Sequence, residues 1–95
     1  MGFKLKISVK ARLDVQEAMD WYNDQLPELG IKFLIDFRST IGYITEHPYS
    51  FRKFDANNRE AGLKIFPYLI IYKVEDLKIT VLGVFNTHQN PTKKP

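Results

Sequence analysis

The chain has 95 residues and a mass of 11.1 kDa, the size of one small domain. It is 44% hydrophobic and 14% aromatic, which is typical of a packed core and argues against disorder. It contains no cysteine and only two histidines, which excludes disulfides, thiol nucleophiles and cysteine- or histidine-rich metal sites.

The formal net charge is +3, and the two halves of the chain share it unevenly. Residues 1–49 hold six basic and seven acidic side chains, whereas residues 50–95 hold eight and four. The basic half favours an acidic or polyanionic partner, although ordinary surface lysines explain such a bias equally well. No run of about 18 apolar residues is present, and lysines interrupt the first six residues. We therefore expect a cytoplasmic protein without a signal peptide or a membrane span.

The first predicted element is a strand over residues 4–9, where charged and apolar side chains alternate. A helical stripe with spacings of three and four residues follows: Ala11, Val15, Ala18, Tyr22 and Leu26. Pro27 ends this helix. A second stripe over residues 33–44 predicts a second helix that ends at His47-Pro48, because helical backbone is disfavoured before proline. Two helices with so short a link fold back as an antiparallel hairpin.

Everything after Pro48 is predicted to be sheet. The expected strands cover residues 50–54, 59–65, 68–75 and 78–86, with turns at 55–58 and 75–77. The last two strands are apolar on both faces, so they should be central, with the helices on one side. The fold class is therefore α+β: an N-terminal strand, an antiparallel helix hairpin packed on one face of the sheet, and an antiparallel β-meander. Residues 1–88 form the domain and residues 89–95 a flexible basic tail.

Several sequence segments occur in an order that is known from one family. They are Ala11-Arg12-Leu13-Asp14, Trp21-Tyr22, Leu29-Gly30-Ile31-Lys32-Phe33, Pro48, Phe66-Pro67-Tyr68 with Ile71-Tyr72, Ile79-Thr80-Val81-Leu82 and His88-Gln89-Asn90-Pro91. Over nearly its whole length the chain resembles the RelE/ParE superfamily of toxins from bacterial type II toxin–antitoxin systems. The resemblance implies the RelE/ParE-like fold and a cognate antitoxin protein as partner. The Phe-Pro-Tyr segment is similar to the ParE-like branch, whose members inhibit DNA gyrase.

Some of these residues also have plain structural explanations. Trp21 and Tyr22 are expected to anchor the core. Asp14 is expected near the start of the first helix, where it favours the helix dipole or caps the helix. Pro67 is expected to mark the start of a strand, where no ladder donor is required.

An alternative function in the same superfamily is metal-independent cleavage of messenger RNA in the ribosome, which needs a base, an acid and cations beside the phosphate. The candidate catalytic residues for that alternative are His88, Arg59 and Lys53; His88 has an ordinary pKa near neutrality. Two departures from the ribonuclease members argue against it. Pro67-Tyr68 stands where one ribonuclease branch has an arginine at the start of the penultimate strand. Many relatives have another arginine two residues before their final proline motif, and the corresponding segment here, Gln89-Asn90-Pro91, contains no arginine.

The expected function is that of a toxin that inhibits growth by binding a macromolecular target, by resemblance DNA gyrase. Whether the chain is an enzyme stays open, as does a third reading in which it only binds its cognate partner. No cofactor or metal is expected. The antitoxin should occupy the groove between the helix hairpin and the sheet, and Arg52, Lys64 and Tyr68 are candidates for binding the antitoxin or the target.

Overall fold

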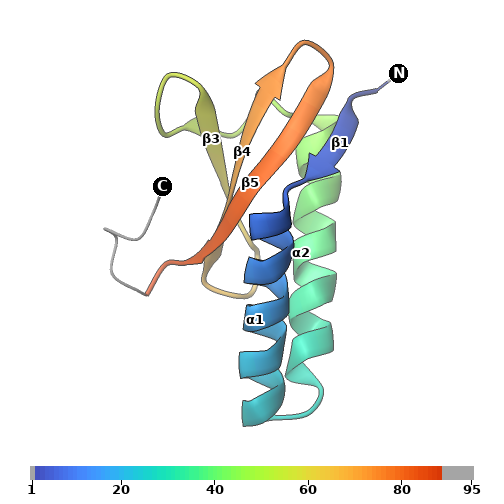
Figure 1. The fold of residues 1–95 in the computed structure, drawn as a ribbon, viewed down its shortest axis with the longest axis vertical. Coiled ribbons are helices and arrows are strands. Elements are labelled where there is room, and N and C mark those ends of the chain that lie inside the picture. Colours follow the sequence, from blue (N-terminus) through green and yellow to red (C-terminus); the bar gives the residue numbers. More distant parts are fainter. Residues whose placement is uncertain (1, 89–95) are drawn as a thin grey trace.

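The computed structural model describes residues 2–88 (Figure 1). Within them lie two helices and five strands: β1 (Lys4–Ile7), α1 (Val9–Gln25), α2 (Leu29–Glu46), β2 (Arg52–Lys53), β3 (Asn58–Gly62), β4 (Tyr68–Glu75) and β5 (Lys78–Asn86). The strands form one sheet in the order β1-β5-β4-β3-β2. The expected α+β architecture is confirmed, with β4 and β5 in the interior of the sheet. The tail expected at residues 89–95 lies outside the described residues.

The sheet is mixed, because β1 pairs with β5 in parallel while the other neighbours are antiparallel. The strands β2 to β5 form the expected meander. Between β4 and β5 the chain reverses through Asp76, whose φ of 55° lies in the left-handed region that aspartate tolerates. The predicted turn at residues 75–77 is therefore present.

The helix boundaries follow from local hydrogen bonds. The Ser8 side chain accepts a hydrogen bond from the Ala11 amide at 3.1 Å and caps α1, which ends the strand at Ile7 rather than residue 9. At the other end of the hairpin the Gly30 amide donates to Asn23 Oδ1 at 2.9 Å. A Cβ atom on Gly30 would lie 2.5 Å from that oxygen, so glycine permits the close approach of the two helices.

The third strand is shorter than predicted, and a buried carboxylate explains why. Residues 59–65 were expected to form a strand, but β3 ends at Gly62. The following amides turn away from the sheet, because the buried Asp36 side chain on α2 accepts hydrogen bonds from the backbone of residues 64, 65 and 66 at 2.8–3.1 Å. Asp36 thus fixes the β3–β4 loop. The strand expected at 50–54 is reduced to Arg52–Lys53.

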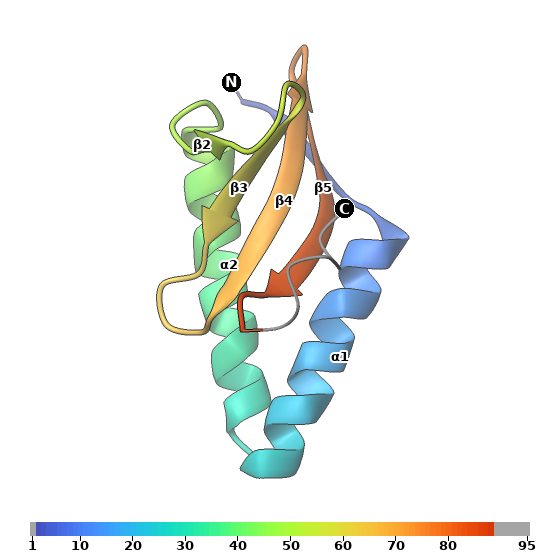
Figure 2. The ribbon, with the colours of Figure 1, turned by 90° about the vertical axis from the view of Figure 1, so that its left-hand side faces the viewer.

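Both helices lie on one side of the sheet, as predicted (Figure 2). The core between them includes eight side chains with 0–1% exposure: Ala11, Phe33, Ile44, Ala61, Ile70, Tyr72, Ile79 and Val81. Tyr22, Phe33, Phe66 and Tyr68 form an aromatic cluster with ring centroids 4.8–6.2 Å apart. This cluster joins the helix hairpin to the start of β4, where Pro67 directly precedes the strand as expected.

Candidate functional site

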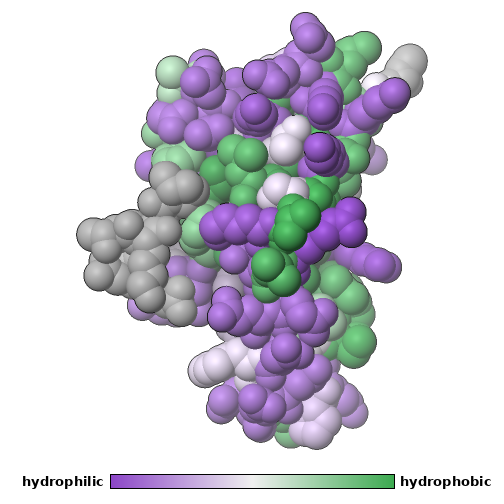
Figure 3. Space-filling model, in the orientation of Figure 1, coloured by the Kyte–Doolittle hydropathy of each residue, from purple (hydrophilic) through white to green (hydrophobic). Residues whose placement is uncertain are grey.

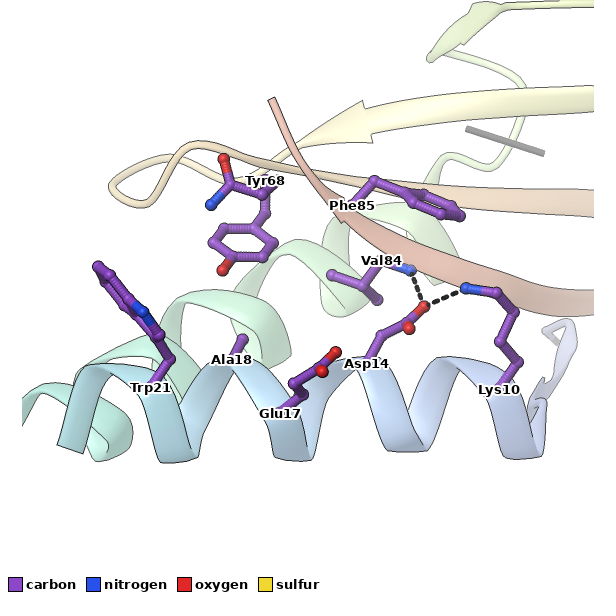
Figure 4. Close-up of a pocket in the computed structure, with 9 residues that line it drawn as sticks. Lys10, Asp14, Glu17, Ala18, Trp21, Tyr68, Val84 and Phe85 are labelled. Carbon is purple, nitrogen blue, oxygen red and sulfur yellow. Dashed lines mark hydrogen bonds and ion pairs between the residues drawn. The ribbon is translucent and has the colours of Figure 1, made fainter. Parts of the chain in front are cut away.

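A groove lies where α1 runs along a free edge of β5 (Figure 4). β1 pairs only with residues 78–81 of β5, so from Leu82 onward this edge has no strand beside it. The groove, here called the α1–β5 groove, has a volume of about 510 Å³. It is lined by Lys10, Asp14, Glu17, Ala18, Trp21, Tyr68, Val84, Phe85 and Asn86.

The free edge of β5 is occupied at one point by Asp14. Its Oδ2 atom accepts hydrogen bonds from the Val84 amide and from Lys10 Nζ, both at 2.9 Å (Figure 4). The expectation that Asp14 caps the helix start is wrong, because Ser8 caps α1 and Asp14 is the sixth helical residue. Its carboxylate instead satisfies a strand amide that would otherwise be open to an added strand.

The expectation that Trp21 anchors the core is also wrong. Its side chain is 56% exposed at one end of the groove, in edge-on contact with Tyr22 at 5.0 Å. Tyr22 does pack against the core, as expected. Adjacent helical residues point about 100° apart, and here Tyr22 lies in the core-facing stripe of α1 while Trp21 turns toward the groove. An exposed tryptophan beside a groove is a common anchor for a binding partner.

Phe85 forms the opposite wall of the groove and is half-buried. Lys10 Nζ lies 4.4 Å from its ring centroid, within the range of a cation–π contact. Gly83 makes room for this ring, because a Cβ atom there would lie 2.7 Å from Phe85 Cε2. Sequence reasoning did not single out Lys10 or Phe85, since their contact joins residues 75 positions apart.

The residues proposed for catalysis fall into two groups. Arg59 on β3 pairs in register with Lys53 on β2, so these two lie together. Arg59 Nη1 donates to the backbone oxygens of Tyr49 and Phe51 at 3.2 and 2.7 Å, and its guanidinium lies 5.2 Å from the Tyr49 ring centroid. Arg59 therefore holds the segment after α2. The Arg59–Lys53 pair lines a smaller cavity of about 180 Å³ with Tyr49 and Lys73.

His88 lies elsewhere. Arg59 is in register with Tyr72, and Tyr72 with Val81. From Val81 the strand β5 runs five more residues to Asn86, about 16 Å at about 3.3 Å per residue. His88 follows that end, exposed, with its amide bonded to Asn86 Oδ1 at 2.7 Å. The structure thus brings Lys53 and Arg59 together and leaves His88 at the opposite end of the sheet.

The three residues proposed for binding occupy three separate places. Arg52 is exposed and bonds Glu60 across the strands at 3.3 Å, on the face opposite to Lys53, because neighbouring strand residues point to opposite faces. Lys64 lies on the β3–β4 loop, with its Nζ 5.7 Å from the ring centroid of Tyr43. Tyr68 is buried beneath the α1–β5 groove and is the one of the three that lines it.

Burial raises the pKa of the Tyr72 hydroxyl to about 12, against the opposing effect of the Arg59 charge. This hydroxyl donates to the Pro48 backbone oxygen at 2.7 Å, which makes it a structural group.

Across residues 2–88, no three His, Asp or Glu side chains are grouped so that they could hold a metal ion. In the same part of the chain, neither helix is long and apolar enough to cross a membrane.

Comparison with known proteins defines the class of this fold. Residues 5–91 match the family model described as the ParE toxin of the type II toxin–antitoxin system parDE. The chain therefore belongs to the ParE toxin family, within the RelE/ParE superfamily that its sequence resembles, and is the toxin component of a type II toxin–antitoxin system.

Two solved structures are similar in fold. The chromosomal ParDE toxin–antitoxin system from P. aeruginosa matches with a TM-score of 0.80 and 20% identity, over 90% of this chain and 97% of that one. The RelBE2 toxin–antitoxin complex from Mycobacterium tuberculosis matches with a TM-score of 0.60 and 15% identity, over 90% and 99%. No curated protein sequence matches the chain.

Proposed function

We propose that this ParE-family toxin arrests growth by binding a macromolecular target, by resemblance DNA gyrase, rather than by cutting RNA. The observation that supports this proposal is the separation of the candidate catalytic residues. Two backbone carbonyls accept hydrogen bonds from Arg59 Nη1, and His88 lies at the other end of β5. An acid–base pair and a phosphate-binding cation must sit within about 3 Å of the same reacting group, which this arrangement does not provide. Gyrase and the ribosome are both cytoplasmic, so the toxin is proposed to act in the cytoplasm.

We further propose that a cognate antitoxin inactivates the toxin by occupying the α1–β5 groove. The edge of β5 beyond Leu82 has no strand beside it, so an extended segment can lie along it without pairing with the Val84 amide, which Asp14 already occupies. The exposed Trp21 side chain offers an apolar anchor beside this edge. Both solved structures of similar fold come from toxin–antitoxin systems, which supports a protein partner of this kind.

A supercoiling assay with purified gyrase tests the target. The purified chain should inhibit supercoiling of relaxed plasmid near stoichiometric amounts, and His88→Ala should inhibit equally well. Full gyrase activity at a large excess of the chain would refute the proposal for gyrase. Growth arrest that His88→Ala or Arg59→Ala abolishes in a folded protein would point instead to RNA cleavage. Normal growth on induction of the chain alone would show a protein that only binds its partner.

The antitoxin site is tested by titrating the purified antitoxin encoded beside the toxin gene into two variants. Trp21→Ala should weaken binding about tenfold or more, because a tryptophan that becomes buried in an interface often contributes more than about 1.4 kcal/mol. Tyr43→Ala is the matched control, since Tyr43 is an aromatic residue of α2 that is 47% exposed and lies outside the groove. Equal affinities of the two variants would place the antitoxin elsewhere.

A further inference from the structure

Four lysines lie close together on the sheet face that the helices leave open. The register sets Lys4 of β1 opposite Lys78 of β5. Two residues further along, Lys6 is opposite Thr80, and Thr80 is opposite Lys73 of β4. Residues paired across strands share a face of the sheet. These four lysines therefore form one surface over three strands, here called the lysine surface.

The lysine surface faces away from the helices. Ile7 and its register partner Val81 pack in the core that the helices cover, and so does Ile79. Neighbouring strand residues point to opposite faces. Lys6 directly precedes Ile7 and Lys78 directly precedes Ile79, so both lysines lie on the other face. Figure 2 shows this face of the sheet, with α2 behind it. Figure 3 shows mainly hydrophilic side chains over the end of the molecule where β1 and the β4–β5 turn lie.

The positive charge of the lysine surface is mostly uncompensated. Lys4, Lys6 and Lys78 are exposed and take part in none of the ion pairs formed among residues 2–88. Lys73 bonds Glu75 at 3.6 Å, and Glu75 is opposite Lys78 on the same face. Four positive charges thus face one negative charge.

This arrangement carries a cost to stability. Like charges directly opposite on paired strands destabilise a sheet, and Lys4 and Lys78 are such a pair, although Glu75 on the other side of Lys78 offsets part of this repulsion. Lysines on edge strands discourage aggregation, which accounts for Lys4 and Lys6 on the edge strand β1. It does not account for Lys78, because β5 is an interior strand that is already paired on both sides there.

We propose that the lysine surface binds the phosphate backbone of double-helical DNA without reading its sequence. Protein–protein interfaces are depleted in lysine, whereas protein–DNA interfaces are polar and strongly basic. The two paired rows of this surface contain no aromatic side chain on which an unpaired base could stack, which disfavours single strands. The lysine side chain is a flexible point charge without the planar fork that pairs with base edges, so contacts to phosphate are expected. This binding goes beyond the proposed function, since neither a protein target nor an antitoxin requires it.

The salt dependence of binding follows from the number of lysines. Three lysines without an acidic partner, at about 0.9 counterions released per phosphate contact, give a slope of about −2.7 in a plot of log affinity against log salt concentration. The affinity should then fall about 40-fold between about 50 and 200 mM salt. Removing one lysine should reduce the slope by about 0.9.

Fluorescence anisotropy of a labelled 20-base-pair DNA duplex, titrated with the full chain, tests the proposal. Lys4→Gln and Lys78→Gln should each weaken binding about tenfold at low salt and flatten the slope. Lys32→Gln is the matched control, because Lys32 is an exposed lysine of α2 away from the sheet, and it should change the affinity less than about twofold. Thermal unfolding should show that Lys4→Gln is at least as stable as the unsubstituted chain, since it removes the repulsion between Lys4 and Lys78.

Three results would overturn the proposal. The first is no binding of the duplex at low salt, and the second is an equal loss of affinity in the Lys32 and Lys78 variants. The third is a competitor of equal length that binds more tightly than the DNA duplex. Tighter binding of polyglutamate would indicate a surface for an acidic protein, and tighter binding of single-stranded DNA or double-stranded RNA would indicate a different nucleic acid. Because the duplex alone is the probe, failure here leaves the result of the gyrase and antitoxin experiments unaffected.

Discussion

The replacement Asp36→Ala tests the role of the buried carboxylate that fixes the β3–β4 loop. Asp36 is 3% exposed and accepts three backbone hydrogen bonds, from Lys64 at 3.1 Å, Ile65 at 2.8 Å and Phe66 at 2.9 Å. The loop holds Phe66 against Tyr22, with ring centroids 4.8 Å apart. Loss of the carboxylate therefore affects the loop and the aromatic cluster together.

The cost can be estimated bond by bond. The Phe66 amide is buried, so leaving it without a partner costs about 1–3 kcal/mol. The other two bonds are partly buried, and water can replace part of each, so they contribute about 1 kcal/mol apiece. The total of about 3–5 kcal/mol is a large fraction of the 5–14 kcal/mol expected for a domain of this length at about 0.05–0.15 kcal/mol per residue.

Urea unfolding followed by circular dichroism measures this cost. At a slope of about 1.5 kcal/mol per molar urea, the midpoint of Asp36→Ala should fall by about 2 M or more with the slope unchanged. Asp36→Asn keeps one carbonyl oxygen and should recover part of the loss. Asp20→Ala is the matched control, because within residues 2–88 the exposed Asp20 side chain accepts a hydrogen bond only from Gln16, and its loss should cost less than about 0.5 kcal/mol. The reasoning is refuted if the Asp36→Ala and Asp20→Ala midpoints agree.

Three further substitutions test separate contacts, each by its urea midpoint. Ser8→Ala removes the cap of α1 and should cost about 1 kcal/mol; an unchanged midpoint would contradict the capping role. Gly83→Ala forces a methyl group against the Phe85 ring and should cost about 1–3 kcal/mol, but much less in a Phe85→Ala background. In the folded protein the pKa of Tyr72 is raised from 10 to about 12, so Tyr72 ionises at a lower pH in the unfolded chain than in the folded one. The contribution of Tyr72 to the free energy of unfolding is therefore complete below pH 10 and should decline between pH 10 and 12. Tyr72→Phe should reduce that decline, and an identical pH profile would refute the assignment.

The order of elements was predictable because it depends on local signals. The three- and four-residue spacing of apolar residues, the prolines after each helix and the turn at residues 75–77 all act within a few positions of the chain. The ends of the strands were less predictable, because distant residues set them. β3 stops at Gly62 since Asp36, 28 residues before Lys64, takes up the next amides.

The groove depended on contacts that local patterns do not contain. The position of Asp14 in the sequence suggested a role at the start of the first helix, yet its carboxylate accepts a hydrogen bond from the Val84 amide, 70 residues away. The parallel pairing of β1 with β5, which leaves the rest of β5 without a strand, likewise joins the two ends of the chain. The exposure of Trp21 was not predicted either, because the core-facing stripe of a helix is wide enough to hold neighbouring residues, and spacing alone did not separate Trp21 from Tyr22.

The two proposed surfaces lie at opposite ends of β5, and this separation has a functional consequence. The α1–β5 groove includes Val84 to Asn86, whereas the lysine surface uses Lys78. Six residues of extended strand separate Lys78 from Val84, about 20 Å at about 3.3 Å per residue. An antitoxin seated in the groove therefore has no need to cover the lysines, and the neutralised complex retains the charge that attracts DNA. Groove variants such as Trp21→Ala should then alter antitoxin binding alone, and Lys78→Gln should alter DNA binding alone. A loss of both activities from either single substitution would mean that the two surfaces are one.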